Sequence, residues 1–144
     1  MSKVKIEMSL NSSENNYFYS GLAIKNDDKI TFCNDGIVTV ITLKPLFTIE
    51  RKGEYYIKLC FLANKIMKGT YNTAIGKFDI ETQTISFINN NNAFEIKYLL
   101  KSNGTVIEKF FVKFQFYYWH CSIIWYNALV NWLLDLRRKI YEVR

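Results

Sequence analysis

Residues 94–116 read FEIKYLLKSNGTVIEKFFVKFQF and decide the fold. Two runs of alternating apolar and polar residues flank Ser102-Asn103-Gly104, a strong signal for a hairpin turn. Apolar side chains recur at every second position, which is the period of a strand rather than of a helix. One face carries Phe94, Ile96, Tyr98 and Leu100 on the first strand, and Glu108, Phe110, Val112, Phe114 and Phe116 on the second. The opposite face of the second strand carries Ile107, Lys109, Phe111, Lys113 and Gln115.

The same pattern extends over most of the chain. Asn34-Asp35-Gly36 predicts a second tight hairpin, and Arg51-Lys52-Gly53 predicts a turn between two strands. Gly69 and Gly76 lie in or beside strands, where glycine often marks a bulge or a sharp bend. About 8–10 short strands without a long crossover helix predict a mainly β fold, an antiparallel lipocalin-like barrel over residues 1–118. A roll of seven strands capped by a helix, as in PH-like domains, is the architectural alternative.

Residues 119–144 are predicted to form one C-terminal α-helix. Its polar residues form a narrow stripe at helical spacing: Asn127, Asn131, Asp135, Arg138 and Glu142. The rest of the helix surface is a wide apolar face, and three interpretations of this face compete. The helix packs on the barrel, on a second subunit or on a protein partner; it lies on a membrane surface with Arg137, Arg138 and Lys139 near anionic lipid; or it spans a bilayer, which its polar residues disfavour.

Composition bounds the class of protein. The chain has 144 residues, the size of one domain, and a formal net charge of +6. A basic balance admits nucleic acid or a membrane surface as partners, although the lysines are spread along the chain as on an ordinary solvated surface. Three cysteines without a CxxC pattern predict reduced, mostly buried thiols. With charged residues at the start of the chain in place of a signal peptide, they indicate a cytoplasmic protein.

Few residues offer chemistry. The one histidine, His120, lies between Trp119 and Cys121 and fits a packed or capping residue. Asp79 and Glu81 share one face of a strand, either as an acid–base pair or as its solvated side. A zinc site needs three or four ligands, which a single imidazole does not supply. We therefore expect no catalytic residues, no metal, no cofactor and no enzymatic activity.

Two functions fit such a barrel. The first is binding of a small apolar ligand or a protein partner, with a lining formed by Phe94, Ile96, Tyr98, Leu100, Phe110, Val112, Phe114 and Phe116. These side chains either fill the barrel or leave room for a ligand, and alternation cannot distinguish the two. The second is binding of single-stranded nucleic acid, with bases stacked on Tyr56 beside Lys58, or on Phe111 beside Lys109 and Lys113. Lysine stems that cover outward rings give the same pattern.

A succession of short motifs runs from residue 19 to 116: Ser20-Gly21, Thr39-Val40-Ile41, Ile49-Glu50-Arg51-Lys52-Gly53, Gly69-Thr70-Tyr71-Asn72-Thr73, Gly76-Lys77-Phe78, Glu81-Thr82, Ile96-Lys97-Tyr98-Leu99-Leu100 and Asn103-Gly104. In order and spacing they resemble the DUF1934 family of small bacterial proteins, the YwiB-like β-barrels of the calycin superfamily. The resemblance implies a closed lipocalin-like barrel in a cytoplasmic protein of low-GC Gram-positive bacteria or their wall-less relatives. It carries over no activity and no functional residues, and it leaves the C-terminal helix unexplained.

Overall fold

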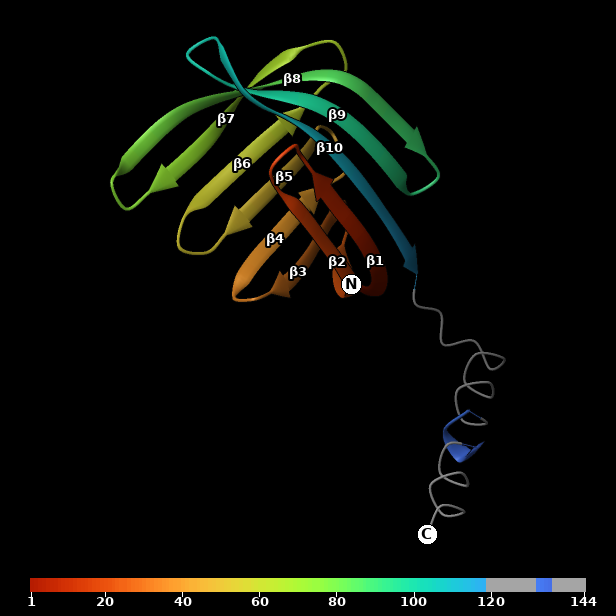
Figure 1. The fold of residues 1–144 in the computed structure, drawn as a ribbon. Coiled ribbons are helices and arrows are strands. Elements are labelled where there is room, and N and C mark those ends of the chain that lie inside the picture. Colours follow the sequence, from red (N-terminus) through yellow and green to blue (C-terminus); the bar gives the residue numbers. More distant parts are fainter. Residues whose placement is uncertain (119–131, 136–144) are drawn as a thin grey trace.

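The computed structural model describes residues 1–118 and 132–135. Its first part consists of ten strands, drawn in Figure 1. Their bounds are β1 Ser2–Asn11, β2 Asn16–Asn26, β3 Lys29–Asn34, β4 Ile37–Thr42, β5 Phe47–Lys52, β6 Tyr56–Phe61, β7 Ile66–Thr73, β8 Gly76–Asn90, β9 Ala93–Ser102 and β10 Thr105–Tyr118.

The strands form a closed antiparallel barrel with an up-and-down order. Each strand pairs with the next along the chain, and β1 also pairs with β10. That last ladder joins Val4 to Tyr118 and Leu10 to Val112 in unbroken register. The predicted antiparallel barrel is confirmed, and a roll of seven strands is excluded over residues 1–118 because ten strands close on themselves.

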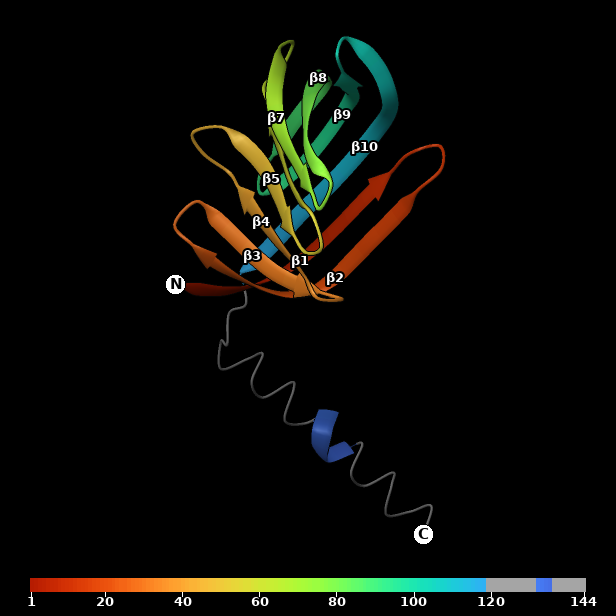
Figure 2. The same cartoon turned by 90° about the vertical axis from the view of Figure 1, so that its left-hand side faces the viewer.

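The barrel has two different ends, which are distinguished by the hairpin turns that lie at each. The turns β1–β2, β3–β4, β5–β6, β7–β8 and β9–β10 lie at one end, called here the mouth, because the strands alternate in direction. The N-terminus and the end of β10 lie at the other end, called the base (Figures 1 and 2). Both predicted tight turns are confirmed: Asp35 and Gly36, like Asn103 and Gly104, have the positive φ angles that such turns require.

Aromatic side chains fill the base. Phe47, Phe61, Phe94, Phe114 and Phe116, called here the base cluster, are all at least nine-tenths buried. The ring centroids of Phe47 and Phe94 are 4.9 Å apart, and those of Phe94 and Phe114 are 6.2 Å apart. Tilted rings at such separations are favourable beyond the area that they bury. The base cluster therefore closes this end of the barrel from within.

The contact between β6 and β7 explains why residue 69, one of the two glycines singled out in the sequence, is a glycine. The two strands pair only from Tyr56 to Lys58 on β6. A Cβ atom on Gly69 would lie 2.7 Å from the Lys58 carbonyl oxygen, so only glycine permits this close approach. The register shifts of the sheet lie elsewhere, at residues 84–86 and 106–108. Gly69 thus marks a close backbone approach; of the two predicted alternatives, a bulge or a sharp bend, the register shows no bulge at this residue.

Two threonines of β8 point into the core near that contact. Thr82 and Thr84 are almost completely buried. The Thr82 hydroxyl donates a hydrogen bond to the Cys60 carbonyl oxygen of β6. The Thr84 hydroxyl has no hydrogen-bond partner among the described residues. The same strand therefore offers one satisfied and one unsatisfied buried hydroxyl, two residues apart.

This pair predicts opposite effects of one substitution. Thr84→Val should raise the free energy of unfolding by about 1 kcal/mol, because it removes a buried hydroxyl without a partner. Thr82→Val should lower it by about 1 kcal/mol, because it removes a hydrogen bond. Urea denaturation of both variants measures this, and each serves as the control for the other's change in shape and strand propensity. Equal effects on the two midpoints would contradict the assignment.

Only a short part of the predicted C-terminal helix is described. Residues 132–135 are helical, and Trp132 is 60% exposed, so this side chain is not part of the core of this chain. His120, Cys121, Trp125 and the basic residues 137–139 lie outside the described residues. The three interpretations of this helix remain predictions. Within the described residues, no helix has the length and apolar character needed to cross a bilayer.

Candidate functional site

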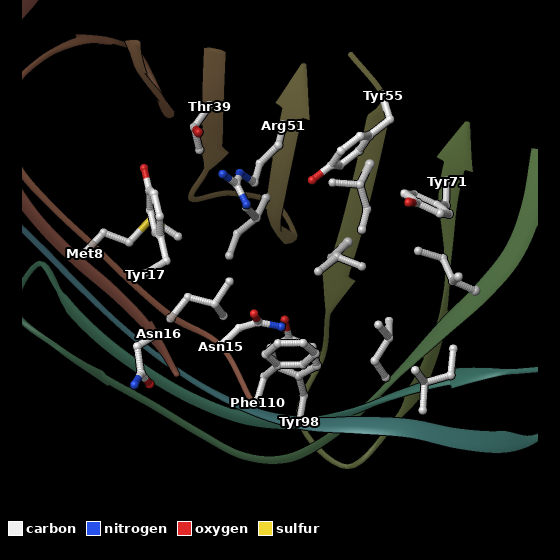
Figure 3. A pocket seen from close by; sticks show the side chains of 17 residues that line it. Met8, Asn15, Asn16, Tyr17, Thr39, Arg51, Tyr55, Tyr71, Tyr98 and Phe110 are labelled. Carbon is white, nitrogen blue, oxygen red and sulfur yellow. The ribbon is translucent and has the colours of Figure 1, made fainter. Parts of the chain in front are cut away.

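The mouth half of the barrel encloses a cavity of about 630 Å³. Its walls come from strands on every side of the barrel. Most of the lining is apolar and includes Ile49, Ile57, Leu59, Ile80, Leu100 and Phe110. Figure 3 shows these walls with the polar side chains among them. A preformed, mainly apolar hollow with a few placed polar groups is the usual form of a small-molecule site.

Arg51 of β5 is the charged residue of this lining. The other lining residues, within the described part of the chain, include no Asp, Glu or Lys. It follows Phe47 and Ile49 on the inward face of the strand, and Figure 3 shows its guanidinium group in the cavity. The guanidinium carbon lies 4.9 Å from the centre of the Tyr17 ring. The buried Nε atom has no hydrogen-bond partner among the described residues. A guanidinium is charged at any physiological pH, so the cavity holds a permanent positive charge.

Tyr98 of β9 connects the cavity with the base cluster. Its ring stacks on Phe110 with centroids 5.3 Å apart, and it meets the edge of Phe61 at 4.8 Å. Burial raises the pKa of Tyr98 well above the usual range, and the nearby positive charge of Arg51 opposes that rise without cancelling it. The phenol is therefore neutral at physiological pH and keeps its proton for donation.

The predicted lining residues divide between the two halves of the barrel. Tyr98, Leu100 and Phe110 line the cavity. Phe94, Ile96, Val112, Phe114 and Phe116 are buried in the core below it. The barrel is thus filled at its base and hollow at its mouth, which alternation alone left open.

Sequence reasoning missed several lining residues. Arg51 was assigned to a turn, but β5 continues to Lys52, so Arg51 lies inside a strand. The period of two after Phe47 and Ile49 was the signal that could have placed it inward. Ile107 was assigned to the outward face, but it lines the cavity beside the register shift between Val106 and Glu108. Tyr17 and Tyr71 also line the cavity.

The family follows from a match to a family model. The model described as "Domain of unknown function (DUF1934)" matches residues 6–113. The chain belongs to the DUF1934 family. No curated protein matches it in sequence. Among solved structures, the ywiB protein from Bacillus subtilis is similar at 11% identity and a TM-score of 0.48, over 78% of this chain and 89% of that one.

The carboxylates proposed for acid–base chemistry lie outside the cavity of this DUF1934 barrel. Ile80 points into the cavity, so its neighbours Asp79 and Glu81 point outward. Glu81 lies across from Lys68 on one side and Lys101 on the other. This arrangement fits the solvated side of a strand. Within residues 1–118 and 132–135, no group of three or more potential metal ligands gathers.

The outward aromatic residues considered for nucleic acid already have protein partners. The ammonium groups of Lys97 and Lys113 lie 5.3 and 5.2 Å from the centre of the Phe111 ring. The Tyr56 hydroxyl donates a 2.6 Å hydrogen bond to Glu50, and burial is the main reason that the pKa of Tyr56 rises to about 12. Lysines that cover an outward ring are the simpler interpretation of this pattern.

Two of the cysteines lie in the described part of the chain. Cys33 and Cys60 are both free thiols. Cys60 is partly buried, and burial raises its pKa. Cys33 is exposed, so the expectation of buried thiols was wrong for this residue. It lies on the outward side of β3, because its neighbour Phe32 occupies the inward position.

The raised pKa of Tyr98 predicts a loss of stability in alkali. An unfolded tyrosine ionises near pH 10, whereas folded Tyr98 ionises at a higher pH. Its contribution to stability is complete below pH about 10 and decreases as the pH rises above that value. The free energy of unfolding of Tyr98→Phe should therefore fall less steeply than that of the parent between pH about 10 and 11. Parallel urea midpoints for the two proteins over this range would contradict the assignment.

Proposed function

We propose that this protein binds a small, largely apolar molecule inside the mouth half of its barrel and is not an enzyme. The observation that carries the proposal is the cavity of about 630 Å³ between the base cluster and the mouth. Its volume falls within the range of about 300–1,000 Å³ that is common for ligand sites.

The closed sheet supports this proposal. Ladders on both sides of every strand fix the walls, so the hollow exists before a ligand enters. Ordered water gains little from apolar walls such as those of Leu59, Ile80 and Leu100. An apolar molecule that replaces it removes its own surface and these side chains from water, which is favourable by about 25 cal/mol per Å².

A non-catalytic role is supported by where the acids lie. Asp79 and Glu81, the pair offered for general acid–base chemistry, point away from the cavity. The polar groups that do face it include a guanidinium that cannot give up its proton at neutral pH and the Tyr98 phenol, whose pKa burial raises. Such groups bind and orient a ligand more readily than they transfer protons.

A neutral fluorescent probe tests the proposal. We expect N-phenyl-1-naphthylamine to bind with saturable fluorescence enhancement at one site per chain. Leu100→Trp should abolish or strongly weaken this binding, because Leu100 lines the cavity and the larger ring would occupy it.

The matched control is Ile88→Trp, at a position on β8 that is 51% exposed. This variant should bind the probe like the parent. Circular dichroism and urea midpoints establish that both variants fold. Absence of saturable binding to the parent, or equal binding by the two variants, would contradict a ligand site in the cavity.

A further inference from the structure

The charge inside the cavity is unbalanced. Arg51 projects into a hollow whose described lining contains no carboxylate. Its contact with the Tyr17 ring at 4.9 Å offsets part of the cost of removing a cation from water. The Nε atom, buried and without a hydrogen-bond partner among the described residues, leaves a donor unused. An anion that enters such an apolar hollow stabilises the cation further, because it supplies both an acceptor and the opposite charge.

We propose that the ligand is an amphipathic carboxylate, whose head group pairs with Arg51 and whose apolar body lies along the wall formed by Leu59, Ile80, Leu100 and Phe110. This inference rests on the proposed function and specifies its ligand class.

The shape of the guanidinium group favours a carboxylate head. Its planar arrangement of N–H donors matches the two oxygens of a carboxylate, and such pairs are frequently bidentate. The Tyr17 ring lies over the guanidinium and limits its orientation. In Figure 3 the Tyr55 hydroxyl also points toward the cavity, where it can donate to an anion.

The position of the cation fits the direction of entry. Arg51 lies one residue before the end of β5 at the mouth, whereas Tyr98 lies deeper, in contact with Phe61 of the base cluster, and Phe110 stacks on Tyr98. A carboxylate at Arg51 thus remains near the opening and close to water. The apolar body extends inward toward Tyr98, where water is excluded.

Competition against the neutral probe tests the ligand class. Decanoate and decanol have the same chain length and differ in the charge of the head group. We expect decanoate to displace N-phenyl-1-naphthylamine at about tenfold to a hundredfold lower concentration than decanol, the usual worth of a hydrogen-bonded charged pair.

Arg51→Met should remove the preference for decanoate over decanol, while the parent and the variant both still bind the probe. Lys109→Met removes an equal charge from the exposed, outward side of β10 and should keep the preference. Because Arg51 has no ionic partner among the lining residues and its buried Nε donor has no hydrogen-bond partner among the described residues, Arg51→Met should unfold at a urea concentration no lower than that of the parent. Arg51→Lys, which keeps the charge without the planar fork, should retain only part of the preference.

The outcomes separate the two proposals. If the parent does not bind the probe, the proposed function fails and the ligand class fails with it. If the probe binds but decanoate and decanol compete equally, or if Arg51→Met keeps the preference, only the carboxylate inference is overturned. A preference lost in both Arg51→Met and Lys109→Met would assign it to net charge and would also overturn the inference.

Discussion

The ladder between β1 and β10 is the constraint on which the rest of the structure depends. It joins the first strand to the last strand of the barrel, more than a hundred residues later in the chain, and leaves no sheet edge open. Closure gives every inward side chain a fixed position on a ring of strands. A barrel of ten strands is wider than a barrel of eight strands, in which inward side chains can just fill the interior. The extra width must be either packed with large rings or left hollow.

This barrel does both, in different halves. Five phenylalanines fill the base, and the largest inward groups toward the mouth are tyrosines and an arginine that stand around a cavity. The base supplies most of the close packing that stabilises the domain. The hollow half contributes less burial, but the hydrogen-bonded walls continue around it. The packed base therefore stabilises the fold, and the mouth half, further along the barrel axis, contains the cavity.

Arg51 is the clearest departure from what stability alone requires. An apolar residue at this inward position would avoid the cost of holding a cation near the walls of an apolar cavity. Stacking on Tyr17 offsets part of that cost, and the mouth gives access to solvent. Sites that break the local pattern of burial are the ones to examine for function. In this molecule that criterion selects a residue on β5, which the strongest sequence pattern, residues 94–116, does not include.

The sequence by itself determined the mainly β, antiparallel fold, both tight turns and the inward phase of Phe94 to Leu100 and Phe110 to Phe116, because period-two alternation and Asn-Gly or Asp-Gly turns are local signals. It did not place Arg51 or Ile107, because the end of β5 and the register shift in β10 depend on pairing with neighbouring strands. Only the tertiary structure decided which inward residues pack and which surround a cavity. That choice depends on where rings from distant strands meet, as Phe47 meets Phe94, and alternation carries no information about height along the barrel.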